Sequence, residues 1–440
     1  MGLLLRRGFA RTRQWFSVGG RVKAVDSDVT DQIQPARRSS QAVAGQLSVA
    51  IYFHDFSPGG VERQCLVLAR ELIERGIDVT IVVHQARGEL IPLLPQGVPV
   101  VNLDGRRTLQ DVLRLRRYLL DRRPGVFMAN VDHNNIAASM AHALAGSATR
   151  LVICQHNPLS SGYHATVNWK HRVVPWFYAA LSRYIDHAVA VSEGIADELV
   201  NQARLPATKV STICNAVIGD DFAALADEPV QHPWLAGRDR PVFVTAGRLV
   251  EMKDQRTMLR AFALHLQAHP ARLIILGTGP MLDELQALTA SLGIAEHVDF
   301  AGFVRNPLPY MRAADAFVLS SRSEGFGNVL VEAMGCGTPV ISTDCPYGPS
   351  DILGQGRYGI LVPMQDPEAL APAFSRIFQE ADRWPKEALR ARAAAFSYQA
   401  CADAYWRLFQ SLAQSPVERH RPDTTAPRPR VDEVASGTVE

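Results

Sequence analysis

The hydrophobic pattern of the chain becomes regular at Leu47, where short apolar runs begin to alternate with amphipathic stretches. Residues 47–56, LSVAIYFHDF, form an apolar run typical of a buried strand, and residues 61–76 place apolar side chains at helical spacing. A turn that ends in two glycines joins these segments, and another apolar run, IDVTIVVH, follows. This succession predicts a strand–helix–strand unit.

The same alternation continues through the first half of the chain. Further strands are predicted at VPVVNL, GVFMAN, RLVICQH, HAVAVS and KVSTICN. Helices are predicted around residues 108–122, 133–145, 168–182 and 193–202. Strands that alternate with helices in this way are typical of a parallel, doubly wound sheet.

Residues 215–240 lose the periodicity and gather Pro, Gly and Asp, which indicates an interdomain linker. A second series then predicts strands at PVFVTAGRL, ARLIILG, HVDFAG, DAFVLSS, PVIST and RYGILVP, with helices between them. The predicted fold class is therefore α/β, with two doubly wound, Rossmann-like domains that face a central cleft. A final amphipathic helix carries Tyr405, Trp406 and Phe409, enough apolar surface to pack across both domains.

These patterns divide the chain into five segments. We expect a disordered N-terminal tail (1–45), an N-terminal domain (46–225), a C-terminal domain (226–397), a C-terminal helix across the domains (398–415) and a disordered C-terminal tail (416–440). The first tail is rich in arginine, so a transit peptide or a membrane contact is an alternative there. Its Asp26 and Asp28 lack the rigid setting that a Mg²⁺ site demands.

Composition excludes several classes of function. The formal net charge of +2 for 440 residues gives no global electrostatic case for nucleic acid, and none is expected as a partner. Six scattered cysteines without CxxC spacing favour a reduced, cytoplasmic protein and no zinc site. No apolar run reaches the roughly 18 residues of a membrane span. Aromatic and basic residues mix in 168–184, so peripheral contact with the inner face of the cell membrane stays open beside a buried helix with a basic face.

Candidate chemistry gathers in residues 315–353, where a strand, a Gly-rich loop, a short helix and a second strand follow one another. Glu324 lies on the loop and Glu332 inside the helix, so both carboxylates can face one crevice. The backbone N–H groups of Gly327, Asn328 and Val329 open that helix and offer an anion site. A ligand with both hydroxyl groups and phosphates, such as a nucleotide-sugar, would satisfy this set.

Other candidates lie at the predicted carboxyl ends of strands. Arg248 and Lys253 follow the first strand of the second half, where two fixed cations can neutralise a diphosphate without a metal; the alternative is a solvated surface pair. In the first half, the Gly59–Gly60 turn lets a ligand approach the backbone, and His156 follows a strand at the ligand-binding edge. A plain tight turn and a satisfied loop histidine are the alternative interpretations of these two features.

One motif points to a different class of enzyme. Gly277 and Gly279 follow a strand and precede a helix, as in a dinucleotide-binding fingerprint, with Asp299 near the expected distance. The third glycine position is Leu282, so the fingerprint is incomplete. We therefore do not favour an NAD-dependent enzyme.

Two segments together, AGRLVEMKDQ (246–255) and SEGFGNVLVEAMGCGTPVIST (323–343), resemble the retaining, GT-B-fold glycosyltransferases of family 4. The resemblance covers roughly residues 47–412. Arg248 and Lys253 match the R-x4-K pair that binds the donor diphosphate in that family, and Glu324 and Glu332 match its E-x7-E. DCPYGPSDIL (344–353) resembles a run in bacterial members that build lipid-linked oligosaccharides or surface polysaccharides, although Asp351 stands where Glu is common.

The resemblance implies a role for each matched residue. Glu324 would lie beside the donor sugar and Glu332 would bind the ribose hydroxyls. The backbone around Phe326 would receive phosphate, the Gly59–Gly60 loop would face the donor, and His156 would lie near the sugar. We accordingly treat Glu324 and His156 as catalytic candidates. The donor-binding candidates are Gly59, Gly60, Arg248, Lys253, Phe326, Gly327, Asn328, Val329 and Glu332.

The implied activity is retaining, metal-independent transfer of a hexosyl or N-acetylhexosaminyl residue. The donor would be a UDP- or GDP-sugar, a substrate rather than a cofactor, and no cofactor is expected. The acceptor would be a saccharide or a polyprenyl-diphosphate-linked saccharide in surface polysaccharide biosynthesis. Two alternatives are a GT-B nucleotide-sugar epimerase, which needs no acceptor, and a catalytically silent sugar- or nucleotide-binding assembly partner.

Overall fold

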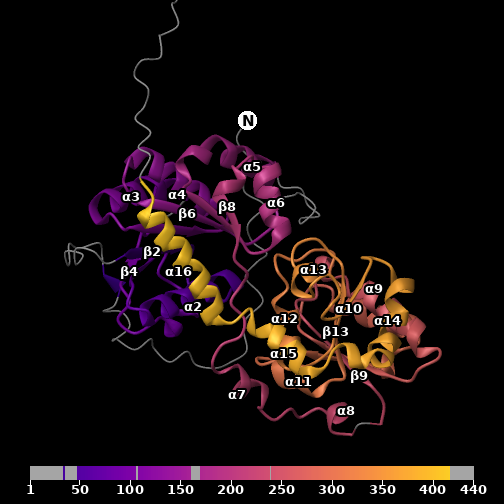
Figure 1. The fold of residues 1–440 in the computed structure, drawn as a ribbon. Coiled ribbons are helices and arrows are strands. Elements are labelled where there is room, and N and C mark those ends of the chain that lie inside the picture. Colours follow the sequence, from indigo (N-terminus) through magenta and orange to yellow (C-terminus); the bar gives the residue numbers. More distant parts are fainter. Residues whose placement is uncertain (1–32, 35–46, 106–107, 160–168, 238, 417–440) are drawn as a thin grey trace, which may run out of the picture.

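The computed structural model describes residues 33–34, 47–105, 108–159, 169–237 and 239–416. The two predicted tails lie outside these residues, apart from residues 33–34 and 416. All six cysteines fall within the described residues and are free thiols. Two α/β domains are visible in Figure 1, one in indigo to magenta and the other in pink to orange.

The N-terminal domain is built on a parallel sheet with the strand order β1-β4-β3-β2-β5-β6-β7-β8. Its apolar runs become strands whose middles are buried on both faces, as helices on both sides of a parallel sheet require. The strands are β1 (Ile33–Gln34), β2 (Ser48–Phe53), β3 (Asp78–Val83), β4 (Val100–Asn102), β5 (Val126–Asn130), β6 (Arg150–Gln155), β7 (His187–Ala190) and β8 (Val210–Thr212).

The helices of this domain connect consecutive parallel strands and cover both faces of the sheet. From β2 to β4 each new strand is added toward one edge of the sheet, and from β5 to β8 toward the other edge. Right-handed crossovers therefore place α2 on one face and α3 to α6 on the other (Figure 1). These helices are α2 (Gly60–Glu74), α3 (Thr108–Arg122), α4 (Asp132–Ala145), α5 (Trp169–Leu181) and α6 (Glu193–Asn201). The reversal places a topological switch point between β2 and β5, where ligands bind in such sheets.

The C-terminal domain has a second parallel sheet, ordered β11-β10-β9-β12-β13-β14. Its strands are β9 (Val242–Ala246), β10 (Arg272–Leu276), β11 (Val298–Gly302), β12 (Ala316–Leu319), β13 (Val340–Thr343) and β14 (Ile360–Val362). Its helices are α9 (Gln255–Leu266), α10 (Leu282–Ser291), α11 (Leu308–Ala313), α12 (Asn328–Gly335), α13 (Pro349–Ile352), α14 (Pro367–Gln379) and α15 (Lys386–Ala394). The predicted fold class, two doubly wound Rossmann-like domains, is confirmed.

The linker segment contains two short helices that the sequence pattern did not predict, α7 (Phe222–Ala226) and α8 (Pro233–Ala236). Each is only about one turn long, too short to show a helical period. The linker meets the end of the C-terminal domain through the N–H of Val217, which donates to the carbonyl of Phe396 at 2.8 Å.

The last helix, α16 (Tyr398–Gln414), returns from the C-terminal domain and lies beside α2 on the N-terminal domain (Figure 1). Ser397 caps its start by accepting from the N–H of Ala400 at 3.2 Å. Tyr405 and Phe409 are buried, and the Tyr405 hydroxyl lies 3.3 Å from the Cys154 sulfur. The chain thus crosses between the domains twice.

Direct contacts also join the two domains. The Tyr347 hydroxyl of the C-terminal domain donates to the Glu198 carboxylate on α6 at 2.6 Å. The backbone N–H of Glu193 donates to Asp351 Oδ2 at 3.1 Å. The carboxyl ends of the two sheets therefore meet across a narrow interface.

Candidate active site

Lys253 and Glu324 form the centre of the predicted site. Lys253 ends the single 3₁₀ turn after β9, and Glu324 lies on the loop after β12, so adjacent strands bring together residues that are far apart in the sequence. The Lys253 ammonium lies 2.5 Å from Glu324 Oε1, and the Ser321 hydroxyl donates to the same oxygen at 2.5 Å. Their side chains are only 17% and 10% exposed, so bulk water screens the pair weakly.

Arg248 supplies a second positive charge at the same end of the sheet. It lies two residues beyond β9 and is exposed. Its carbonyl accepts from the Gln255 side chain at 3.1 Å, which ties the backbone of the turn to α9. Within the described residues its guanidinium has no hydrogen-bond or ion-pair partner, so its five N–H donors are available to an anion.

Helix α12 points its first turn into this region. Gly327, with φ of 106°, is its N-cap, a left-handed conformation that favours glycine. Within the described residues, the backbone N–H groups of Gly327, Asn328 and Val329 donate to no backbone carbonyl. Phe326 beneath them is buried and packs edge-on against Phe396. The loop is thus anchored from below and presents free N–H groups above, as an anion site requires.

Glu332 lies one turn further along α12 and is half-buried. Its carboxylate has no hydrogen-bond or ion-pair partner among the residues described here. Burial raises the pKa of this carboxyl to about 7. A carboxyl group that is partly buried and has no protein partner is suited to bind the hydroxyl groups of a ligand.

His156 approaches from the other domain. It follows β6, is buried, and its carbonyl oxygen lies so close to Gly325 that a Cβ on that glycine would be 2.3 Å away. The predicted catalytic residues of the two domains are therefore brought together at one interface. Burial lowers the pKa of the His156 imidazole to about 4, so the ring is neutral at physiological pH.

Asn130, at the end of β5, sets the protonation of His156. Its Nδ2 donates to the Tyr52 carbonyl at 3.1 Å, which turns Oδ1 toward His156 Nε2, also at 3.1 Å. A neutral imidazole that meets an acceptor at Nε2 carries its proton there, which leaves Nδ1 as a hydrogen-bond acceptor. Sequence reasoning missed Asn130 and Ser321, although both lie at or just beyond a strand's carboxyl end, the signal that singled out His156.

Gly59 and Gly60 begin α2 at the same sheet edge as His156. Gly59 has an ordinary φ of −122°, and the nearest atoms to a Cβ there would be those of the flexible Glu62 carboxylate, at 2.0 Å. A Cβ on Gly60 would meet nothing within 4 Å. Local packing therefore does not demand glycine at Gly60, and a ligand-facing role for the turn stays a prediction.

The incomplete dinucleotide fingerprint has a structural explanation. A Cβ on Gly277 would lie 1.9 Å from the Gly247 carbonyl oxygen, and one on Gly279 would lie 2.2 Å from the Leu249 carbonyl oxygen. Both glycines let the turn after β10 pack against the backbone that carries Arg248. Asp299 Oδ2 lies 3.1 Å from Nε2 of His232, a residue of the linker, so its carboxylate is bonded within the protein.

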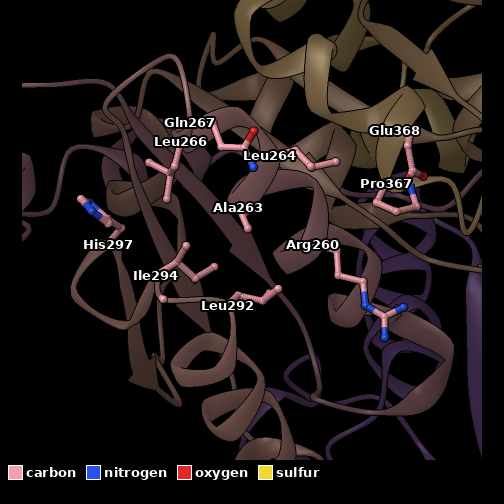
Figure 2. Close-up of a pocket in the computed structure, with 11 residues that line it drawn as sticks. Arg260, Ala263, Leu264, Leu266, Gln267, Leu292, Ile294, His297, Pro367 and Glu368 are labelled. Atoms are coloured by element: carbon pink, nitrogen blue, oxygen red, sulfur yellow. The ribbon is translucent and has the colours of Figure 1, made fainter.

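A separate hollow of about 490 Å³ lies beside the second half of α9 (Figure 2). Its lining includes Arg260, Leu264, His297 and Glu368, and none of the predicted site residues. Within the described ranges, no group of His, Cys, Asp and Glu is arranged to hold a metal ion. The helices of these ranges include no candidate for a membrane span. The expectation of metal-free chemistry stays a prediction.

Comparison with known families agrees with this geometry. Residues 58–218 match the family described as Glycosyltransferase Family 4, and residues 240–380 match Glycosyl transferases group 1. Together the matches cover more than half of the 440 residues. The chain belongs to the glycosyltransferases of family 4. The family resemblance stated from the sequence is therefore confirmed, and with it the expectation of a glycosyltransferase; retention and metal independence stay predictions.

Two curated relatives of this glycosyltransferase have names that refer to lipopolysaccharide core biosynthesis or to a diphospho-undecaprenol acceptor. The lipopolysaccharide core biosynthesis glycosyltransferase LpsE of Rhizobium meliloti (strain 1021) is 28% identical over 378 residues, 82% of this chain and 98% of the relative. An N-acetylgalactosamine-N,N'-diacetylbacillosaminyl-diphospho-undecaprenol 4-alpha-N-acetylgalactosaminyltransferase of Campylobacter jejuni is 29% identical over 250 residues, 57% of this chain and 66% of the relative.

Solved structures show the same two-domain fold. The lipopolysaccharide outer core galactosyltransferase WaaB, in its apo form, is 18% identical with a TM-score of 0.67, and the alignment covers 83% of this glycosyltransferase and 99% of that chain. Anabaena Alr3699/HepE, in complex with UDP and glucose, is 20% identical with a TM-score of 0.66, covering 83% and 100%. At these identities the likeness shows the fold.

Proposed function

We propose that this glycosyltransferase is a retaining, metal-independent enzyme of surface polysaccharide or lipid-linked oligosaccharide biosynthesis. It transfers a hexosyl or N-acetylhexosaminyl residue from a UDP- or GDP-sugar to a saccharide or polyprenyl-diphosphate-linked saccharide. The relatives named for lipopolysaccharide core and diphospho-undecaprenol acceptors support the acceptor class. The neighbour solved with UDP and glucose supports a UDP-sugar donor.

The observation that carries the proposal is the Lys253–Glu324 pair, next to which Gly325 packs against the His156 carbonyl of the other domain. The donor diphosphate would lie between Arg248, Lys253 and the N–H groups that open α12. These groups neutralise the charge that develops on a departing diphosphate, which is the largest electrostatic demand of the reaction. Lys253 has three donors, so it can keep Glu324 while it binds phosphate.

In the transfer step, the bond between the anomeric carbon and the diphosphate oxygen breaks, and its electron pair leaves with the diphosphate. A hydroxyl oxygen of the acceptor forms the new bond to the same face of the sugar. The hydroxyl proton passes to the departing phosphate oxygen. Glu324 Oε1 accepts hydrogen bonds from Lys253 and Ser321, which hold the carboxylate in place. From this position the carboxylate can orient the sugar and offset the positive charge that develops on the sugar.

A lipid-linked acceptor requires contact with a membrane surface, and one face of the N-terminal domain suits it. Leu113 on α3, Leu144 on α4 and Trp176 on α5 are 68%, 55% and 67% exposed. Arg116 joins two of these helices by donating to the Leu144 carbonyl at 3.1 Å. Exposed apolar side chains among arginines favour peripheral binding to anionic lipid. Flotation with vesicles containing phosphatidylglycerol tests this, and Trp176→Ala should reduce the bound fraction.

The donor is tested first by thermal shift with UDP, GDP and their sugars. A nucleotide at about 100 times its dissociation constant adds about 2.7 kcal/mol of stability. The chosen donor is then incubated with and without octyl glycosides as acceptor mimics, and product formation is followed by mass spectrometry. Acceptor-dependent transfer supports the proposal. Conversion of the donor sugar without acceptor indicates an epimerase, and binding without any conversion indicates a silent partner.

A further inference from the structure

Three histidine side chains pack together at the carboxyl edge of the N-terminal sheet. The rings of His54 and His84 lie parallel, with centroids 4.6 Å apart and planes 13° apart. His133 meets His54 edge-on, with centroids 5.3 Å apart. His84 is buried, His54 is half-buried and His133 is exposed, so the cluster leads from the protein interior to solvent.

A buried carboxylate anchors the inner end of this cluster. Asp111 is fully buried, and its Oδ2 lies 2.5 Å from His84 Nδ1 and accepts from the Tyr52 hydroxyl at 3.0 Å. Gly105 covers the pair so closely that a Cβ there would lie 2.2 Å from Asp111 Oδ1 and 2.6 Å from the His84 ring. These contacts fix the orientation of the His84 ring, and the His54 ring stacks on it.

The cluster lies at the place where doubly wound sheets bind ligands. His54 and His84 directly follow β2 and β3, and His133 lies three residues beyond β5. The strand order puts β2 beside β5, so the cluster occupies the topological switch point. The Asn130 amide bonds both the end of β2 and His156, so His156 lies one strand away from the cluster.

The chemistry of the cluster favours an uncharged, hydroxyl-bearing ligand. The pKa of His54 is lowered, first by its partial burial and then by the neighbouring His84. Neutral imidazoles do not attract phosphate, but each can donate one hydrogen bond and accept another. His54 Nδ1 is buried and has no hydrogen-bond partner within the described residues. A ligand hydroxyl would satisfy it, and the ring faces suit the C–H groups of a sugar.

We propose that His54, His84 and His133 form a subsite for the sugar ring of a glycosyl acceptor. His54 and His133 hold the ring's hydroxyl groups, and the Asp111–His84 pair holds His54 in position. The subsite rests on the proposed function, because only a transferase needs an acceptor beside the donor. The subsite lies one strand away from His156. An acceptor bound there would therefore present its hydroxyl group to the donor sugar beside His156.

The test uses the full chain labelled with ¹⁵N-histidine. Methyl and octyl β-glucoside, β-galactoside and N-acetyl-β-glucosaminide are each titrated below the concentration at which the octyl compounds form micelles, with UDP present at a fixed level. We expect at least one glycoside to shift the imidazole signals of His54 and His133 saturably. His133→Ala should weaken that glycoside at least tenfold. A preference for octyl over methyl glycosides would show that the lipid chain adds contacts of its own.

A matched control is His269→Ala. His269 is an exposed histidine stacked on the buried His265, with centroids 5.3 Å apart, and lies three residues beyond α9 in the other domain. This variant should bind the glycoside like the wild type. His133→Gln, which keeps a hydrogen-bonding group, should recover part of the affinity.

Two outcomes would overturn the subsite. One is that no glycoside shifts the His54 or His133 signals; the other is that His133→Ala binds the glycoside as tightly as wild type. UDP binding, followed by thermal shift in the same samples, reports on the donor site alone. Failure of the wild type to bind either UDP or GDP would therefore refute the proposed function and not the glycoside subsite.

Discussion

Replacing Glu332 with glutamine removes one ionisable group from the site and leaves its shape almost unchanged. Burial raises the pKa of Glu332 from its ordinary 4.5 to about 7. Between these values the folded protein keeps a proton that the unfolded chain has released. Glu332 therefore contributes stability that is complete below pH 4.5 and is lost as the pH rises through about 7. Glu332→Gln should abolish this dependence.

The size of the effect follows from the difference between the two pKa values. At full strength it corresponds to about 3 kcal/mol, and partial exposure of the carboxyl reduces it to about 2 kcal/mol. Glu332→Gln should thus be more stable than wild type by about this amount at pH 8 and equal to it at pH 4.5. For a domain of this size, that gain raises Tm by about 4–8 °C.

Thermal unfolding of both proteins from pH 4.5 to 8, without nucleotide, measures the difference directly. Glu380→Gln is the control, because bonds from Arg376 and then Arg383 lower the pKa of Glu380. Glu380→Gln should therefore be less stable than wild type at neutral pH, whereas Glu332→Gln should be more stable. Equal Tm values for wild type and Glu332→Gln at pH 8 would refute the reasoning. UDP should stabilise Glu332→Gln less than wild type, because a neutral amide accepts ribose hydroxyls less strongly.

Three further substitutions probe the interface. Gly325→Ala puts a methyl group 2.3 Å from the His156 carbonyl oxygen and should push the two domains apart. We expect at least a tenfold loss of transfer and a larger radius of gyration by X-ray scattering. Unchanged transfer would contradict this. Asn130→Asp places a carboxylate beside the same imidazole and should raise its pKa, which an altered pH–rate profile would reveal. Tyr347→Phe removes the 2.6 Å bond to Glu198 and should raise the donor KM severalfold with little change in kcat.

Gly237→Ala serves as the control for the glycine substitution. A Cβ there would be no closer than 3.6 Å to its nearest neighbour, so the linker can accept it. Transfer by this variant should equal that of the wild type. A loss similar to that of Gly325→Ala would show that the linker, not the contact with His156, limits the reaction.

The alternation of apolar and amphipathic runs was sufficient to predict the strands and most helices, because each has a strong local period. It failed for α13 and the linker helices, which are too short to show one, and for β1, whose two residues pair with β4 only through the tertiary fold. Helix α5 continues through Pro175, although a proline inside a helix removes one backbone hydrogen bond.

The site was predictable in part for a similar reason. Arg248, Lys253, Glu324 and Glu332 stand at recognisable spacings, so motif reasoning found them. Their mutual contacts were not predictable, because the Lys253–Glu324 bond joins residues from two different strands. The three-histidine cluster escaped notice since His54, His84 and His133 lie far apart in the sequence and converge only when β2, β3 and β5 take neighbouring places in the sheet.

The central claim is that the crevice around Lys253 and Glu324 transfers a sugar with retention of its anomeric configuration. Proton NMR of the reaction with an α-linked nucleotide-sugar and an octyl glycoside tests it directly, because the coupling constant of the anomeric proton reports the new linkage. An α-linked product that wild type makes and Glu324→Ala does not is the predicted result. A β-linked product, or an α-linked one formed equally by both proteins, would contradict the account.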